Sequence, residues 1–245
     1  MQIHIFRDAQ LAGRAAATLI AAQLLRKPDS ILGLATGSTP IPAYETLIDM
    51  HQTGMLDFSQ AVSFNLDEYV GISPEHPCSY HHFMQEQLFA QVNIRPENVH
   101  IPDGNAPDLT AAAKAYDAAI LQAGGIDLQL LGIGRNGHIG FNEPGEHFVY
   151  GCHKVALSQS TIQANRRFFE TEADVPRYAV SLGIGSIMQA RQVLLVATGS
   201  DKAEAVRRAL EEDVSPQWQA SILRTHPDVV FLLDEAAAGK LRHRP

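Results

Sequence analysis

The chain has 245 residues, of which 45% are hydrophobic and 19% are charged, and its net charge is −8. This size and composition suit one globular domain with a large core. The acidic balance and the lack of a basic stripe argue against nucleic acid as a partner. No apolar stretch approaches the roughly 18 residues that span a bilayer, so we expect no insertion into a membrane.

The chain has two cysteines, Cys78 and Cys152, which form no C-x-x-C pair. We interpret them as free thiols of a reducing compartment. The first residues, MQIHIF, lack the basic start and the long apolar run of a signal peptide. We therefore expect a cytoplasmic protein.

In the first half of the chain, short apolar runs alternate with helical segments. The runs predict strands at residues 2–6, 30–35, 61–66 and 99–101. The predicted helices are residues 9–25, 41–51, about 80–91 and 108–123. Asp8 is a suitable N-cap for the first helix and Ser79 for the third, and a Gly-Gly pair at 124–125 ends the fourth.

The alternation continues in the second half. Strands are predicted at residues 126–133, 178–182, 193–197 and 229–233, and helices at 158–169, 202–210 and 235–241. Most of the strands have no polar face, which is typical of a mostly parallel sheet with helices on both faces. Residues 145–178 depart from this pattern. We predict one α/β domain over residues 1–245, with a mobile lid at about 158–178.

Polar loops follow four of the predicted strands. Their sequences are TGSTP (36–40), DEY (67–69), GRNGH (134–138) and TGSDK (198–202). In open α/β sheets, ligands bind outside the carboxyl ends of the strands. We therefore expect these four loops to converge on one edge of the sheet.

The loops TGSTP and TGSDK have the chemistry of a phosphate site. Small residues expose backbone N–H groups, hydroxyls donate hydrogen bonds, and the start of a helix favours negative charge. Lys202 adds a positive charge. Neither loop has a nucleotide-binding pattern. The alternatives are a plain turn with a Ser/Thr cap at 36–40 and an ordinary exposed lysine at 202.

Two further loops carry groups that could transfer protons. Asp67 and Glu68 end a strand, where they would either cap a helix, lie in solvent or act on a ligand. His138 stands among glycines that could leave its ring exposed, and Glu143 could hold it in one tautomer. The alternative for His138 is a purely structural role.

Metal binding is not indicated by the remaining histidines. The chain contains no H-E-x-x-H and no matched Cys/His spacing. We therefore expect no metal site.

Read together, the strand-end segments resemble one known family. LGLATGSTP, NLDEYVG, SYHHFM, GIGRNGHIGFNEPG, VPRYAVSLGIGSIM and GSDKAEAV are similar to the glucosamine-6-phosphate deaminase family, in the same order over nearly the whole chain. The segments GRNGHIGFNEPG and NLDEYVG are the most specific. The resemblance implies a Rossmann-like, mostly parallel sheet. It also implies conversion of glucosamine 6-phosphate and water to fructose 6-phosphate and ammonia, in amino-sugar catabolism and without an organic cofactor.

The same resemblance implies residue roles. Asp67 matches the base that moves a proton between C2 and C1 of the sugar, and His138 matches the residue that opens the ring, with Glu143 as its partner. Asn136 stands where many members carry Asp, so we expect it to orient its neighbours through hydrogen bonds. The implied phosphate contacts are Gly37, Ser38, Thr39, Arg167 and Lys202. Arg167 lies in ANRRFF, which matches the family's lid.

Three alternatives differ in chemistry. A 6-phosphogluconolactonase would tend to show Pro-Asp-Gly-His and lack FNEPG. A galactosamine-6-phosphate deaminase is not separated by the sequence. A sugar-phosphate sensor without activity is disfavoured because Asp67, His138 and Glu143 are all present and no DNA-binding helix pair precedes the fold. The chain also lacks the longer tail of allosteric hexameric members, so we expect a monomer that binds a small sugar phosphate.

Overall fold

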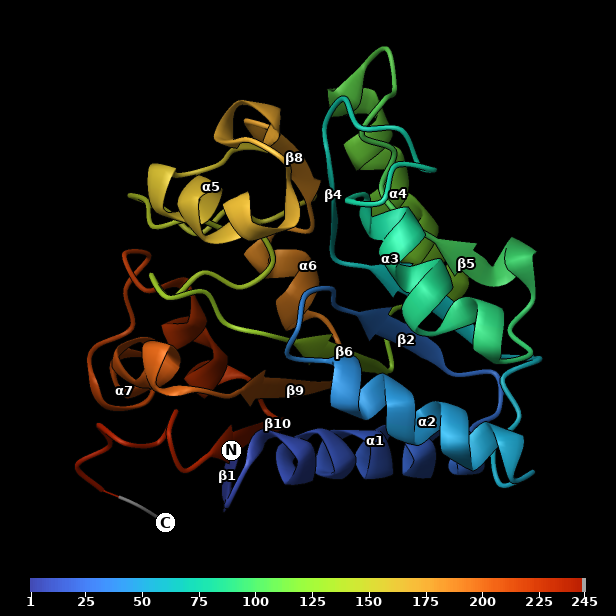
Figure 1. Ribbon diagram of the computed structural model, residues 1–245, viewed down its shortest axis with the longest axis horizontal. Helices are drawn as coiled ribbons and strands as arrows, with labels where there is room; N and C mark the ends of the chain where they lie inside the picture. Colours follow the sequence, from blue (N-terminus) through green and yellow to red (C-terminus); the bar gives the residue numbers. More distant parts are fainter. Residues whose placement is uncertain (244–245) are drawn as a thin grey trace.

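A seven-stranded sheet in which all neighbouring strands are parallel forms the centre of the computed structural model, which describes residues 1–243 (Figure 1). Across the sheet the strands are β1 (Gln2–Phe6), β10 (Val229–Asp234), β9 (Gln192–Ala197), β6 (Leu128–Leu131), β2 (Ile31–Leu34), β3 (Val62–Asn65) and β5 (Val99–His100). The prediction of an open, mostly parallel sheet is confirmed. The strand order reverses between β2 and β6, which is the point where such sheets bind ligands.

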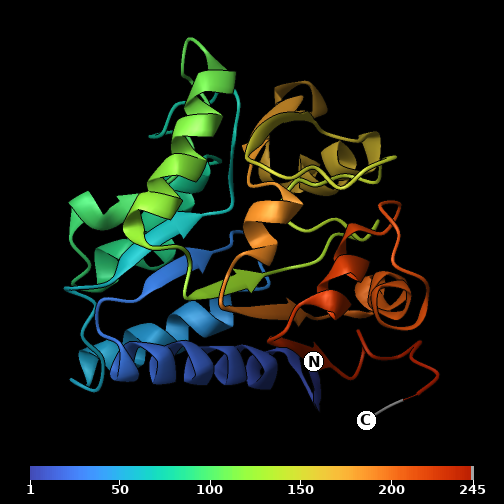
Figure 2. The same ribbon diagram turned by 180° about the vertical axis from the view of Figure 1, so that it is seen from behind.

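Helices cover both faces of this sheet, as predicted. α1 (Ala9–Arg26) and α2 (Ile41–Gln52) pack together along one face, and α6 (Ile184–Met188) lies over the other, as both views show (Figures 1 and 2). The remaining helices are α3 (Tyr80–Gln87), α4 (Leu109–Ala123), α5 (Gln159–Asn165) and α7 (Ala203–Glu211). Strands β2, β6 and β10 are buried over their whole length, which fits their mainly apolar sequences; Gln129 in β6 and Asp234 at the end of β10 are polar.

Short 3₁₀ turns complete the backbone, at Phe89–Gln91, Pro96–Asn98, Arg166–Phe168, Glu172–Asp174, Ser200–Lys202 and Gln219–Thr225. Within residues 1–243, none of the helices has the length and apolar character needed to cross a bilayer.

A second, antiparallel sheet stands above the carboxyl edge of the first. Its strands are β4 (Asp67–Tyr69), β8 (Tyr178–Ser181) and β7 (His153–Ala156), in that order. The chain passes from one sheet to the other at Leu66, whose N–H donates to Leu34 O in the main sheet and whose carbonyl accepts from Leu182 N. Asp67 therefore lies at the junction of the two sheets.

Several sequence predictions are wrong in detail. Residues 67–69, expected as a loop, form β4, and β7 was not predicted at all. The strand predicted at 178–182 belongs to the second sheet. The final helix predicted at 235–241 is a series of turns, closed by bonds such as Gly239 N to Ala236 O. The mid-segment Gly239 disfavours a continuous helix there. The helix predicted at 158–169 ends at Asn165 and continues as a 3₁₀ turn.

Candidate active site

The four polar loops converge as expected, because they follow the neighbouring strands β9, β6, β2 and β3 on the same edge of the sheet. The loops after β6 and β2 flank the reversal of strand order. The second sheet begins directly after β3, so it closes over this edge.

The loop after β6 folds tightly around His138. Gly134 N donates to His138 O at 2.8 Å, and a Cβ on Gly134 would lie 2.5 Å from the imidazole ring. Gly137 and Gly140 have φ angles of 83° and 54°, a region that favours glycine. The glycines thus allow the ring to lie against its own loop, with 19% of the side chain exposed.

Glu143 is bound through both carboxylate oxygens. Oε2 lies 3.5 Å from His138 Nδ1 and accepts a hydrogen bond from Asn136 Nδ2 at 2.7 Å. Oε1 accepts from Thr161 Oγ1 at 2.5 Å and from Ser158 N at 3.2 Å. Within residues 1–243, His138 Nδ1 has no hydrogen-bond partner, so the carboxylate is the group it faces.

These contacts decide the charge of Glu143. Burial alone would raise the pKa of its carboxyl, but the contacts from His138, Thr161 and Asn136 outweigh it and lower the pKa to about 2. The carboxylate is therefore ionised at neutral pH and supplies the negative charge beside His138. Asn136 also accepts a hydrogen bond from the backbone N–H of His138, at 3.3 Å. It therefore contacts both His138 and Glu143 and holds them together.

Asp67 lies in the opposite kind of environment. Only 6% of the residue is exposed, and within the described chain no hydrogen bond reaches its carboxyl group. Burial, with a smaller contribution from the negative charge of Glu68, raises its pKa to about 8. A Cβ on Gly140 would lie 3.6 Å from Asp67 Oδ2, so the carboxyl group borders the loop that carries His138.

Glu68 points away from this site. Its carboxylate accepts from the backbone N–H groups of Tyr80 and His81 at 3.0 and 2.9 Å, and from that of Tyr69 at 2.8 Å. It therefore caps α3. Of the alternatives weighed for the acidic pair, helix capping applies to Glu68 and not to Asp67.

The predicted phosphate residues come from three segments. Gly37, Ser38 and Thr39 form the loop after β2, and Gly37 has a φ of 94° with open space around its Cα. Arg167 reaches this loop from the segment after α5, with its guanidinium 3.5 Å from Ser38 Oγ.

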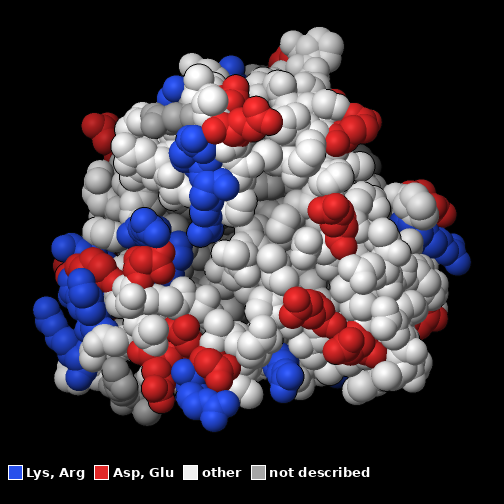
Figure 3. Space-filling view, viewed as in Figure 1, with Lys and Arg blue, Asp and Glu red and all other residues white. Residues whose placement is uncertain are grey.

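Lys202, Arg135 and Arg167 form a basic corner of the site. Burial lowers the pKa of its ammonium group; Asp201 opposes this effect, and the positive charges of Arg135 and Arg167 add to it. Asp201 Oδ2 lies 2.8 Å from Arg135 Nε and 4.0 Å from Lys202 Nζ. Figure 3 shows Lys and Arg side chains gathered beside a hollow on the face viewed in Figure 1. Arg135 and Lys202 share the Asp201 carboxylate, and Arg167 adds a third positive charge near Lys202, which suits an anionic ligand.

Sequence reasoning missed three contributors. Arg135 lies in the glycine loop itself, and a basic residue there could have been noticed in so acidic a chain. Thr161 could have been noticed because Ser158 is a suitable N-cap, which places Thr161 in the first turn of α5. Asp234 ends a buried strand, and its two oxygens accept from Gly199 N at 3.1 and 2.9 Å, which fixes the turn before Lys202.

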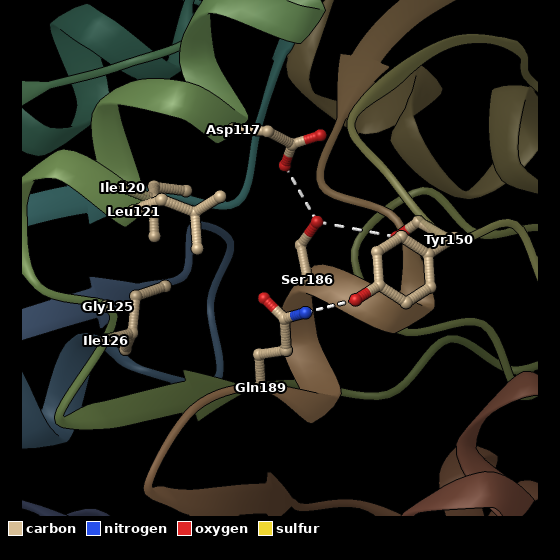
Figure 4. A pocket seen from close by; sticks show the side chains of 8 residues that line it. All are labelled: Asp117, Ile120, Leu121, Gly125, Ile126, Tyr150, Ser186 and Gln189. Carbon is tan, nitrogen blue, oxygen red and sulfur yellow. Dashed lines mark hydrogen bonds between the residues drawn. The ribbon is translucent and has the colours of Figure 1, made fainter.

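A separate cavity of about 140 Å³ lies between α4 and α6 (Figure 4). Its polar groups bind one another: Ser186 Oγ donates to Asp117 at 2.7 Å, and Gln189 pairs with the hydroxyl of Tyr150. No predicted site residue lines it. Among residues 1–243, no group of three His, Cys, Asp or Glu side chains is arranged to hold a metal ion.

The fold and the site define a class of α/β enzyme. One edge of its sheet brings together a basic corner, a histidine, and two carboxyl groups of which one has a raised pKa and the other a lowered pKa. A sequence profile described as glucosamine-6-phosphate isomerases/6-phosphogluconolactonase matches residues 7–231. The chain belongs to this family.

Individual relatives agree with this assignment. The glucosamine-6-phosphate deaminase of Rhodopirellula baltica is 50% identical, covering 100% of this chain and 97% of that protein. That of Thermoanaerobacter pseudethanolicus is 47% identical, covering 98% and 94%. A solved structure of a monomeric glucosamine-6-phosphate deaminase matches with a TM-score of 0.96 and 43% identity, over 98% of this chain and 99% of that one. A 6-phosphogluconolactonase from Leishmania guyanensis, at 22% identity and a TM-score of 0.75 over 99% of both chains, shares the fold.

Proposed function

We propose that this chain is a glucosamine-6-phosphate deaminase, which converts glucosamine 6-phosphate and water to fructose 6-phosphate and ammonia in amino-sugar catabolism. One observation carries the site assignment: two carboxyl groups in opposite environments lie at the same edge of the sheet. A buried carboxyl group that no hydrogen bond reaches within residues 1–243, that of Asp67, borders the loop in which an ionised carboxylate, Glu143, faces His138. Aldose–ketose isomerisation needs a base for carbon and a separate group for ring oxygens.

In this proposal the basic corner binds the phosphate. Arg167 and Lys202 supply positive charge, and the loop of Gly37, Ser38 and Thr39 supplies N–H and hydroxyl donors. Because the phosphate is remote from C1 and C2, its binding energy orients the reacting carbons without taking part in the bond changes.

His138 then opens the sugar ring. The imidazole accepts the proton of the O1 hydroxyl and returns a proton to the ring oxygen, which gives the open aldehyde. The ionised Glu143 stabilises the imidazolium formed between these two transfers, while Asn136 holds both groups in place.

Asp67 acts next, as the carbon base. Its carboxylate removes the proton at C2 and delivers it to C1. The aldehyde oxygen gains a proton and the amino nitrogen loses one, so that the aldehyde carbon becomes an alcohol carbon and C2 becomes an imine. Water adds to this imine, and the nitrogen leaves as ammonia to give the ketone. A pKa near 8 suits a base that must both accept and return a proton near neutral pH.

We further propose that the enzyme acts in the cytoplasm as a monomer, with no nucleic-acid or membrane partner. The monomeric deaminase at 43% identity supports the oligomeric state. Sedimentation at working concentration tests it: a single species near 26.7 kDa is expected.

Ammonia release from glucosamine 6-phosphate, measured beside its galactosamine epimer and 6-phosphogluconolactone, tests the function. We expect turnover of the glucosamine substrate, with the epimer slower and no hydrolysis of the lactone. A chain that hydrolysed the lactone and released no ammonia would refute the proposal.

A further inference from the structure

The first turn of α5 contacts Glu143 through Oε1, the other oxygen from the one that faces the glycine loop. Thr161 is 4% exposed, although it belongs to a segment predicted as a polar lid. Its hydroxyl lies 2.5 Å from Glu143 Oε1, and the two residues are 18 positions apart in the chain. The proposed proton transfers do not involve this hydroxyl.

The two oxygens of Glu143 are divided between two parts of the protein. Oε2 faces Asn136 and His138 in the glycine loop, whereas Oε1 accepts hydrogen bonds from the α5 side, from Thr161 Oγ1 and Ser158 N. A carboxylate is planar, so fixing Oε1 also fixes the direction in which Oε2 meets the imidazole.

The direction of the Thr161 hydroxyl is itself determined. An ionised carboxylate can only accept, so the hydroxyl donates to Glu143. Ser158 Oγ donates to Thr161 Oγ1 at 3.0 Å and accepts from Thr161 N at 3.2 Å, as the N-cap of α5. The cap of the helix and the orientation of the catalytic carboxylate therefore belong to one hydrogen-bonded unit.

We propose that Thr161 is a positioning residue, which sets the plane of the Glu143 carboxylate and through it the orientation of His138. The inference rests on the proposed function and deepens it. It also divides the predicted lid: the turn at 158–161 belongs to the fixed site, and any motion begins after it.

Two substitutions of Thr161 separate this role from simple packing. Thr161→Val keeps the shape and removes the hydroxyl, whereas Thr161→Ser keeps the hydroxyl and removes the methyl group. Since misplacement of a reacting group by about 1 Å can cost roughly 100-fold in rate, we expect Thr161→Val to lower kcat by roughly 10- to 100-fold. KM should change less than about twofold, because no phosphate residue is touched, and Thr161→Ser should retain most of kcat. A packing role predicts the reverse order.

A double-mutant cycle with Glu143→Gln tests whether Thr161 acts through Glu143. In the Gln background, Thr161→Val should have little further effect on kcat. Full turnover of Thr161→Val beside an active parent, or equal kcat losses in both backgrounds, would overturn the inference and leave the proposed function standing. A parent that released no ammonia would instead overturn the proposed function, and the inference with it.

Discussion

Asp67 and Glu143 border the same glycine loop, but their surroundings have opposite effects on their acidity. Asp67 starts a three-residue strand, and its carboxyl group is buried, receives no hydrogen bond from the described residues, and has a pKa raised to about 8. Glu143 is also largely buried, but four contacts hold its oxygens, and those from His138, Thr161 and Asn136 lower its pKa to about 2. Burial acts on both groups, so the partners make the difference.

That contrast separates the proposed tasks. A carboxyl with a pKa near neutrality can take a proton from carbon and give it back. A carboxylate that stays ionised can only stabilise a neighbouring positive charge. Two carboxyl groups whose environments move their pKa values apart are the usual sign of a divided acid–base role.

The largest effect on activity is expected from removing the proton-accepting oxygen of Asp67. Asp67→Asn should lower kcat for ammonia release by about 10²–10⁴-fold, the usual cost of losing a positioned acid or base. The matched control is the neighbouring Glu68→Gln, which alters the cap of α3 and should cost stability while keeping most of kcat. Similar losses of kcat in the two variants would show that the site does not distinguish the adjacent carboxyl groups.

A smaller effect is expected at the basic corner. Lys202→Ala should raise KM for glucosamine 6-phosphate by roughly tenfold, or about 1.4 kcal/mol of binding, because the substrate loses a charged contact. Lys240→Ala is the control: this lysine is exposed and pairs with Glu204 on α7. Steady-state kinetics of both variants check the assignment, which fails if the two KM values change equally.

The raised pKa of Asp67 also predicts a change in stability. The folded protein keeps this carboxyl protonated up to about pH 8, whereas an unfolded chain releases the proton near pH 4. Ionisation therefore opposes folding, and its cost grows as the pH rises from about 4 to 8. Asp67→Asn removes that cost. Its free energy of unfolding should exceed that of the parent by several kcal/mol at pH 8, because each unit of pKa difference corresponds to about 1.4 kcal/mol, with the difference declining toward pH 4. Urea unfolding at both pH values measures it, and a less stable variant at pH 8 would contradict the assigned environment.

The predicted lid gives the smallest effect. We expect a sugar-phosphate analogue to slow amide hydrogen exchange in residues 162–178 by bringing Arg167 to the phosphate. Residues 158–161 should be protected already, because Glu143 holds their turn. Exchange followed by mass spectrometry with and without the analogue tests this division. Equal protection of 162–178 in the two states would argue against a lid.

The sheet could be predicted because its information is local. Runs such as Ile31–Leu34 and Leu128–Leu131 are buried on both faces and read as apolar sequence. The second sheet could not be predicted in the same way. Asp67–Tyr69 is too short to show a period, and it becomes a strand only because Val180 and its neighbours lie beside it.

The site shows the same limit. Its specific motifs identified Asp67, His138 and Glu143 as candidates, but motif and composition do not show which carboxyl group is ionised. That depends on partners far along the chain, as with Thr161 on Glu143 and Asp201 beside Arg135. Spacing along a sequence does not reveal such contacts; packing does.

Isotope exchange at carbon tests the central claim most directly. With fructose 6-phosphate and ammonium in deuterated water, the parent enzyme should place solvent deuterium at C1, because Asp67 removes and returns that proton in the reverse direction. Proton NMR follows the loss of the C1 signal. Asp67→Asn should show no exchange above background while still binding the phosphosugar. Exchange at C1 at the parental rate in Asp67→Asn would contradict the account and leave Glu143 as the base to be tested next.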